Sequence, residues 1–255
     1  MTDTTESLAA AGAGPAGADT PTIRGDLKML AYWVSLGAAA GGLGGVLIGG
    51  IGGRLAMFFL RLTSDHSVRG LESDDGFIIG RFDFTATASL MVVTSVLGVV
   101  VGLIVVAGRP FFPKRGMPFA WALAGAITGG ALLISSDGID FTLLGPHSFA
   151  VALFIAIPAA GAGSIAWLTE LYPRFWWRNR KLTGLAALAA VPAVIAFPLA
   201  IFALLVSAIW LVAIQSPPVR TLHTRRPVRA MATVLFGLIV TLGLLDLVGD
   251  VREIV

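Results

Sequence analysis

Residues 29–53 read MLAYWVSLGAAAGGLGGVLIGGIGG, a stretch without one charged side chain. About 20 consecutive apolar residues are enough for a helix to cross the roughly 30 Å hydrocarbon core of a bilayer. Residues four apart lie along one face of a helix. The segment therefore predicts a spanning helix with a groove that lacks side chains, lined by the glycines that recur at every fourth position, Gly37, Gly41, Gly45, Gly49 and Gly53.

This glycine face has two interpretations, and the sequence leaves both open. The face packs against a neighbouring helix of the same chain, or it contacts a second copy and forms a homo-oligomer. Small residues at helix interfaces serve internal packing in most polytopic membrane proteins, so we favour the first interpretation.

The whole chain has the composition of an integral membrane protein. Of its 255 residues, 56% are hydrophobic and 13% are charged, whereas a soluble domain carries about 25% charged residues. The chain has no cysteine, which excludes disulfides and thiolate metal sites. Its net charge of +3 resides in short loops between apolar runs, where membrane topology explains it, so we expect no nucleic-acid partner.

Further apolar runs predict an all-α polytopic transmembrane helical bundle with six or seven spanning helices. The transmembrane domain is expected to cover residues 27–255 as one unit. Residues 1–26 are rich in Ala, Gly, Thr and Pro and have no long apolar core, so we expect a disordered cytoplasmic tail. After the first run, the apolar runs cover residues 85–108, 118–136, 148–169, 182–219 and 230–245.

Loop charges orient the predicted bundle. The stretches 63–86 and 137–147 are acidic, whereas 108–117 and 170–181 are basic. Basic loops stay in the cytoplasm, so we expect a multi-pass protein of the cell (inner) membrane with its N-terminus in the cytoplasm.

The run 182–219 decides between six and seven spans. As one helix, residues 182–216 would be about 52 Å long, well over the hydrocarbon thickness. A hairpin broken near Pro198 gives seven spans and keeps the following basic loop in the cytoplasm, which charge bias favours. Because residues 194–200 contain no polar turn residue, a single long helix and an inside C-terminus stay open.

A candidate polar site is expected near the outer boundary. Arg54 and Arg61 follow the glycine face at i and i+7. We expect them to snorkel to lipid headgroups, with pairing to an outer acid as the alternative. No calcium-loop spacing is present, so we expect solvated turns and helix caps, with no metal and no cofactor; a site for a hard cation on the acidic outer loops stays open as the alternative. The remaining candidates are Asp65, His66, Asp74, Asp75, Asp137 and Asp140.

The two acidic loops also resemble each other. Residues 73–76 (SDDG) precede 83–85 (DFT), and residues 135–138 (SSDG) precede 140–142 (DFT). This echo predicts that the first two spans and the next two form a parallel repeat. Asp-Gly turns also recur without common descent, so chance stays open as the explanation.

The chemistry-bearing residues form no catalytic motif. The histidines are scattered without metal-ligand spacing, and the runs from 85 to 219 hold no ionisable residue at mid-depth. We therefore expect a non-enzymatic protein, either a channel-like or transport component or a structural membrane partner, with membrane lipids as partners. The alternative is a membrane-embedded enzyme that acts on lipid-linked or envelope substrates through the outer Arg/Asp/His cluster.

Several short segments stand out together: residues 52–57 (GGRLAM), 68–77 (VRGLESDDGF), 80–82 (GRF), 137–141 (DGIDF) and 245–247 (LDL) with Asp250. With these segments the chain resembles a group of multi-pass membrane proteins from actinobacteria. The resemblance implies a cell-membrane location and no particular activity.

Overall fold

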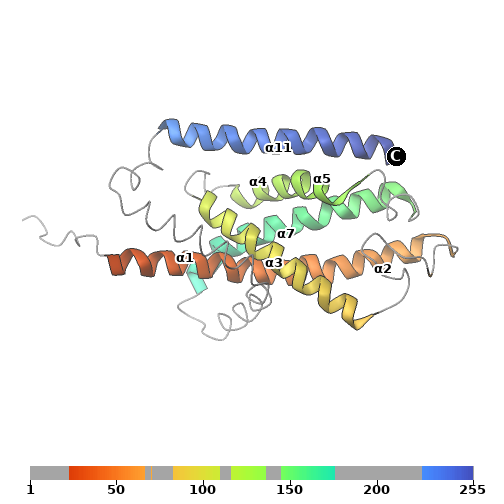
Figure 1. Cartoon of the computed structure of the whole chain (residues 1–255), viewed down its shortest axis with the longest axis horizontal. Coiled ribbons are helices and arrows are strands. Elements are labelled where there is room, and N and C mark those ends of the chain that lie inside the picture. The colour runs from red at the N-terminus through yellow and green to blue at the C-terminus, as the bar shows by residue number, and fades with distance from the viewer. Residues whose placement is uncertain are drawn as a thin grey trace, which may run out of the picture.

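The computed structural model describes residues 23–66, 70, 83–109, 116–135, 145–175 and 226–254. All regular structure in these residues is helical, which confirms the all-α prediction for them (Figure 1). In chain order the elements are α1 (Ile23–Gly44), the π-helix η2 (Gly45–Gly52), α2 (Gly53–Thr63), α3 (Phe84–Gly108), α4 (Met117–Ala124), the π-helix η4 (Gly125–Gly129), α5 (Gly130–Leu133), α7 (His147–Phe175) and α11 (Arg226–Ile254).

The first helical hairpin pairs a long rod with α3. The rod consists of α1, η2 and α2, which join without a break because Gly44 and Gly53 at the junctions keep right-handed helical dihedrals. α3 runs antiparallel to it, since Gly37 near the start of the rod lies against Gly102 near the end of α3. The rod begins at Ile23, inside the expected tail 1–26.

The second helical hairpin pairs α4, η4 and α5 with α7. These helices are also antiparallel, because Ala122 lies against Gly163 and Gly125 lies against Ala162. The second hairpin therefore repeats the plan of the first, with a π segment inside its first helix.

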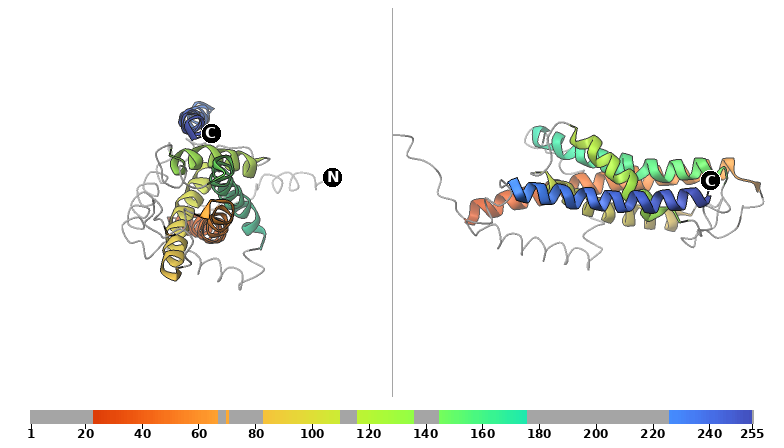
Figure 2. Two further views of the ribbon diagram at one scale, coloured as in Figure 1. Left: turned by 90° about the vertical axis from the view of Figure 1, so that its right-hand side faces the viewer. Right: turned by 90° about the horizontal axis from the view of Figure 1, so that it is seen from above.

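α11 runs parallel to α4 and α5. The ring centroids of Trp121 and Phe236 lie 5.5 Å apart, and Leu247 lies against Gly130 further along both helices. An end-on view shows α11 at the edge of the bundle, beside the second hairpin (Figure 2).

These directions give the described bundle two ends of different charge. α1, α4 and α11 begin at one end, where α3 and α7 finish; this basic end carries Arg109 and Arg226 together with one acid, Glu170. The opposite, acidic end also holds Arg61 and Arg252, and its acids are Asp65, Asp83, Asp246, Asp250 and Glu253.

Four helices are long and apolar enough to cross a membrane, and 117–133 forms a shorter apolar helix. α11 covers Arg226–Ile254, so the helix extends beyond the apolar run 230–245 at both ends. The run 182–219, and with it the choice between six and seven spans, lies outside the described residues. The four candidate spans are Tyr32–Thr63, Phe84–Gly108, His147–Tyr172 and Arg226–Ile254.

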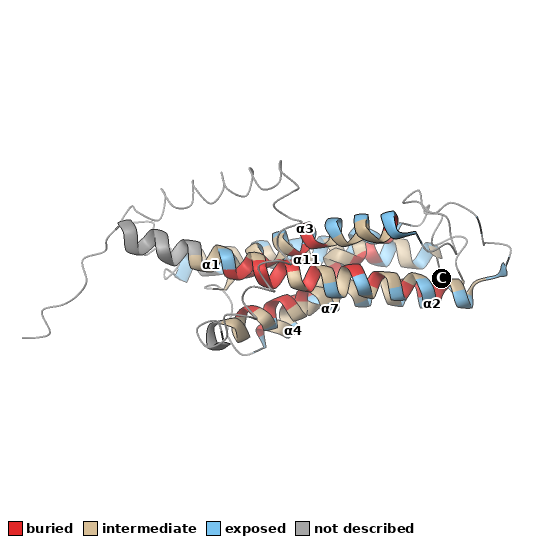
Figure 3. Cartoon of the chain, turned by 90° about the horizontal axis from the view of Figure 1, so that it is seen from below, coloured by how far each residue is buried: buried red, intermediate tan, exposed pale blue. Residues whose placement is uncertain are grey.

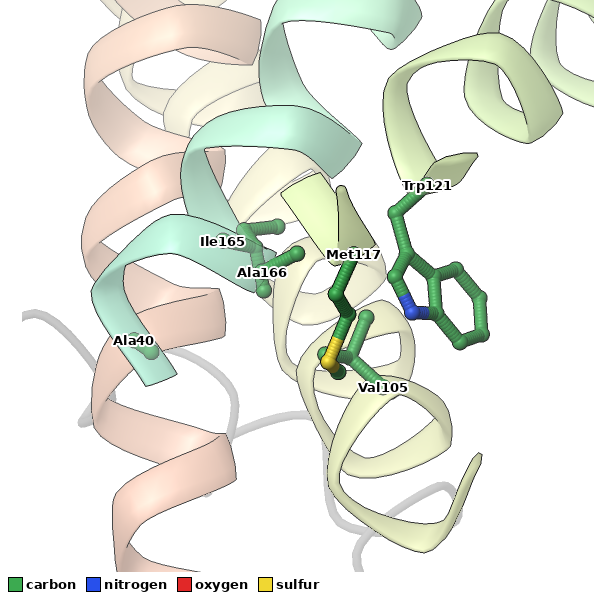
Figure 4. Close-up of a cluster of buried hydrophobic side chains, with 6 residues drawn as sticks. All are labelled: Ala40, Val105, Met117, Trp121, Ile165 and Ala166. Carbon is green, nitrogen blue, oxygen red and sulfur yellow. The ribbon is translucent and has the colours of Figure 1, made fainter. Parts of the chain in front are cut away.

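Two buried apolar clusters hold the described helices together. Buried residues follow the inner faces of the helices, whereas the outward faces are exposed (Figure 3). The cluster nearer the acidic end contains Leu60, Ile134, Ala150, Val151 and Leu247. The cluster nearer the basic end joins both hairpins through Ala40, Val105, Met117, Trp121, Ile165 and Ala166 (Figure 4).

Candidate functional site

The glycine face of the rod lies directly against α3. A methyl group on Gly37 would lie 2.9 Å from the Gly102 carbonyl oxygen, and a methyl group on Gly41 would meet the Gly98 carbonyl. The contact is reciprocal, because a methyl group on Gly98 would meet the Gly41 carbonyl and lie 2.8 Å from the Cα of Gly45. We call this backbone-to-backbone contact the glycine seam.

The glycine seam ends within η2. A methyl group on Gly49 would lie 2.7 Å from the Cβ of Thr94, so a side chain replaces the backbone as the neighbour. Gly53 has only an ordinary van der Waals neighbour, Leu90 at 3.7 Å. α3 has no glycine at this level, so the side chains of Thr94 and Leu90 meet the rod there. The sequence pattern extends further than the seam because the seam needs glycine on both helices.

α3 occupies the space that a lumen along the seam would need. The five seam glycines, Gly37, Gly41 and Gly45 of the rod and Gly98 and Gly102 of α3, approach closer than any side chain would permit, so water has no room between the two helices. A homo-oligomer through the same glycines stays a prediction, and it would require α3 to move aside.

The described members of the outer polar set lie on and just beyond α2. Arg54 and Arg61 are half-buried, on the flank beside the buried stripe of α2. The Nε atom of Arg61 is buried and has no hydrogen-bond partner within the part of the chain that the structure describes. Asp65 and His66 follow the helix and are exposed. The other predicted members, Asp74, Asp75, Asp137 and Asp140, lie outside the described residues.

Ser64 connects this polar region to the second hairpin. Its hydroxyl lies 3.1 Å from the carbonyl oxygen of Gly145, and the Gly145 backbone N–H donates to the same hydroxyl at 3.1 Å. The end of α2 is therefore fixed beside the start of α7.

A polar cluster that the sequence did not lead us to expect lies at the basic end. The Arg109 guanidinium donates from Nε to Glu170 Oε1 at 2.8 Å and from Nη2 to Oε2 at 3.1 Å. Its Cζ lies 4.7 Å from the ring centroid of Trp33, within cation–π range. These three residues join α1, α7 and the end of α3. A signal was present, because Glu170 is the one acid in the basic stretch 170–181.

The described part of the chain offers no metal site. Within it, no group of three or more His, Cys, Asp or Glu residues is placed to hold an ion.

Comparison with protein-family models, with curated proteins and with solved structures finds no match for this chain.

Proposed function

We propose that this protein is a structural component of the cell membrane, a closed helical bundle with lipid as its surroundings. The observation that carries the proposal is the glycine seam, since it fills the groove that a channel would need. The outward faces support lipid as the partner, because they expose large apolar side chains such as Phe58, Val93, Leu132 and Leu235.

The interior of the described bundle supports a closed structure as well. Its buried side chains are apolar apart from Ser95 and Thr169. The Thr169 hydroxyl donates its hydrogen to the Ala166 carbonyl of its own helix at 2.7 Å, so its only donor is used within α7. A polar pathway needs groups that replace the hydration shell of its cargo.

The proposed topology has seven spans, a cytoplasmic N-terminus and an outside C-terminus. Two features support it. The bases at the basic end agree with a cytoplasmic side. Phe175 and Arg226 both lie at that end, and a chain that leaves and re-enters on one side crosses an even number of times. Reporters of periplasmic and cytoplasmic location, fused after Thr224 and after the C-terminus, should indicate inside and outside, respectively.

Reconstitution tests the structural role. Liposomes that contain the purified protein and a trapped dye, sensitive to potassium or to protons, are exposed to a gradient of that ion. The dye signal should change no faster than it does in protein-free liposomes. Flux that rises with protein content would refute the closed bundle and favour a channel. A second preparation with Gly98→Ala, which forces the seam apart, checks that the assay detects leakage when packing is lost.

A further inference from the structure

Arg61 lies near the end of α2 without an acidic partner among the described residues. It forms no ion pair with them, and its Nε atom is buried without a hydrogen-bond partner. The acid four residues on, Asp65, is out of helical register, because the helix ends before Ser64, whose dihedrals are extended. Arg109, in contrast, places two guanidinium nitrogens on Glu170. A buried donor without an acceptor costs free energy, so an acceptor from outside the described helices would stabilise Arg61.

Arg61 shares one flank of α2 with a second arginine and an aromatic ring. Arg54, Phe58 and Arg61 lie at i, i+4 and i+7, and we call these three residues the basic flank of α2. The flank lies outside the buried stripe of this helix. Phe58 is 50% exposed, and Leu62 beside Arg61 is 58% exposed. The basic flank therefore presents two basic side chains to the surroundings of the bundle, with apolar surface between and beside them.

The length of the rod places the basic flank at the depth of lipid headgroups. Trp33 contacts the Arg109 guanidinium at the basic end, and tryptophan is enriched at membrane–water interfaces. Arg54 and Arg61 come 21 and 28 residues after Trp33 in one continuous helical rod. At 1.5 Å per residue these separations are about 32 Å and 42 Å. A bilayer has a hydrocarbon core of about 30 Å and measures about 40–45 Å with its headgroups. With Trp33 at one interface, Arg54 therefore reaches the far edge of the hydrocarbon core and Arg61 reaches the far headgroups.

We propose that the basic flank of α2 binds the phosphodiester group of a glycerophospholipid in the leaflet at the acidic end. The proposal rests on the proposed function, since it names a binding site for one lipid of the bilayer that surrounds the bundle. Arginine binds phosphate oxygens through two parallel, charge-assisted hydrogen bonds. The phosphodiester would therefore supply the acceptors for Arg61, and an acyl chain of the same molecule would lie along Phe58.

The charge of the acidic end favours a lipid over a free anion as the ligand. Carboxylates such as Asp65 and Asp83 lie at this end of the bundle, and they repel phosphate that approaches from water. A lipid is held at the depth of the arginines by its acyl chains, so its phosphodiester has a high effective concentration beside them.

Native mass spectrometry of the full-length protein, delipidated in mild detergent and titrated with dioleoylphosphatidylglycerol, tests the site. We expect Arg61→Gln to weaken binding about tenfold, because it removes hydrogen bonds to a charged group. Arg61→Lys should bind with intermediate affinity, since it keeps the charge and loses the two-pronged contact. Arg252→Gln is the matched control, because Arg252 is an exposed arginine at the same end of the bundle, on α11. Dioleoylglycerol has the same acyl chains and no phosphate, so it should bind the unchanged protein and Arg61→Gln equally.

Three results would overturn the proposal. The first is equal affinity of the unchanged protein and Arg61→Gln for phosphatidylglycerol, and the second is an equal loss in Arg252→Gln, which would indicate a response to net charge alone. The third is displacement of the lipid by millimolar inorganic phosphate, which would assign the basic flank to a free anion. If thermal unfolding in lipid-free detergent shows that Arg61→Gln does not fold, Arg61→Lys decides instead, and unchanged affinity in that variant overturns the proposal.

The liposome assay separates this proposal from the proposed function. Ion flux that rises with protein content refutes the closed bundle, whether or not the lipid binds. Loss of phosphate-dependent lipid binding without flux refutes the basic flank alone.

Discussion

The two helical hairpins share one arrangement of helices but differ in the atoms that make the contact between their helices. Each has a first helix interrupted by a π segment, η2 or η4, and an antiparallel second helix, α3 or α7. In the first hairpin, glycine faces glycine, so backbone meets backbone on both sides. In the second, Gly163 faces the side chain of Ala122 and Gly129 faces the ring of Pro158. Among the described glycines of this hairpin, only Gly125 meets a backbone group as its nearest neighbour, the Pro158 carbonyl oxygen at 2.5 Å from its methyl position.

This difference determines how each hairpin responds to added volume. A backbone-to-backbone contact has no side chain that a second substitution could shorten. A contact between glycine and a side chain can be relaxed by shortening that side chain. The helix separation of the first hairpin is therefore fixed by backbone contacts at all its seam glycines, whereas the second hairpin has one such contact, at Gly125, and otherwise depends on its side chains.

The largest expected effect is that of Gly41→Leu. The new side chain would collide with the Gly98 carbonyl and the Cα of Val99, which lies 2.8 Å from the methyl position. Overpacking a rigid core typically destabilises by about 1–3 kcal/mol, and a backbone neighbour places this variant at about 3 kcal/mol or more. Unfolding in mixed micelles of mild detergent and SDS, followed by tryptophan fluorescence, measures the change.

Gly52→Leu is the matched control for that substitution. Gly52 lies in the same rod, and its nearest neighbour is the Leu47 carbonyl oxygen of the rod itself, at 3.8 Å. We expect no loss from overpacking at this position. Leucine favours helix over glycine at both positions, so equal loss of stability in both variants would show that the effect does not come from the seam.

A rescue experiment distinguishes the two hairpins, because a second substitution should restore about 1–2 kcal/mol of stability in the second hairpin and none in the first. Gly163→Ala adds a methyl group 2.9 Å from the Cβ of Ala122, and Ala122→Gly removes that atom. The double variant should regain part of the lost stability in a double-mutant cycle. Gly98→Ala should have no such rescue, because its neighbours Gly41 and Gly45 are already glycines. If Ala122→Gly does not rescue Gly163→Ala, the backbone also fixes the helix separation of the second hairpin at this position.

Much of this architecture could be predicted from the sequence, since the apolar runs 85–108 and 148–169 nearly match α3 and α7. Periodicity also predicted which rod face would be free of side chains. It could not predict where the seam ends, because that depends on the residues of α3 that face the rod, Thr94 and Leu90, and not on the spacing within the rod. The parallel repeat that the loop echo predicts stays a prediction: Asp83 precedes α3 directly, whereas α7 begins at His147, seven residues after Asp140.

The Arg109–Glu170 pair differs from the contacts within each hairpin, since it is polar and lies between the two hairpins. We expect Arg109→Ala to lower the free energy of unfolding by about 1–2 kcal/mol, because the pair is bidentate and only 21% and 23% exposed. Arg109→Lys should restore little, since an ammonium group cannot make the two-pronged contact. A cycle with Glu170→Gln measures the coupling, and zero coupling would reduce the pair to an incidental contact.

The smallest expected effect concerns the start of α3. The Asp83 Oδ1 atom accepts a hydrogen bond from the Thr85 backbone N–H at 2.9 Å, which satisfies one free donor of the first helical turn. Asp83→Ala should destabilise by about 1 kcal/mol, and Asp83→Asn should retain most of the stability because asparagine also caps helices. Hydrogen exchange at the Thr85 and Ala86 amides should rise in the alanine variant, while amides of the glycine seam stay protected. Faster exchange at Gly98 would show that the seam depends on the cap, and that the first hairpin is held from its end as much as from its middle.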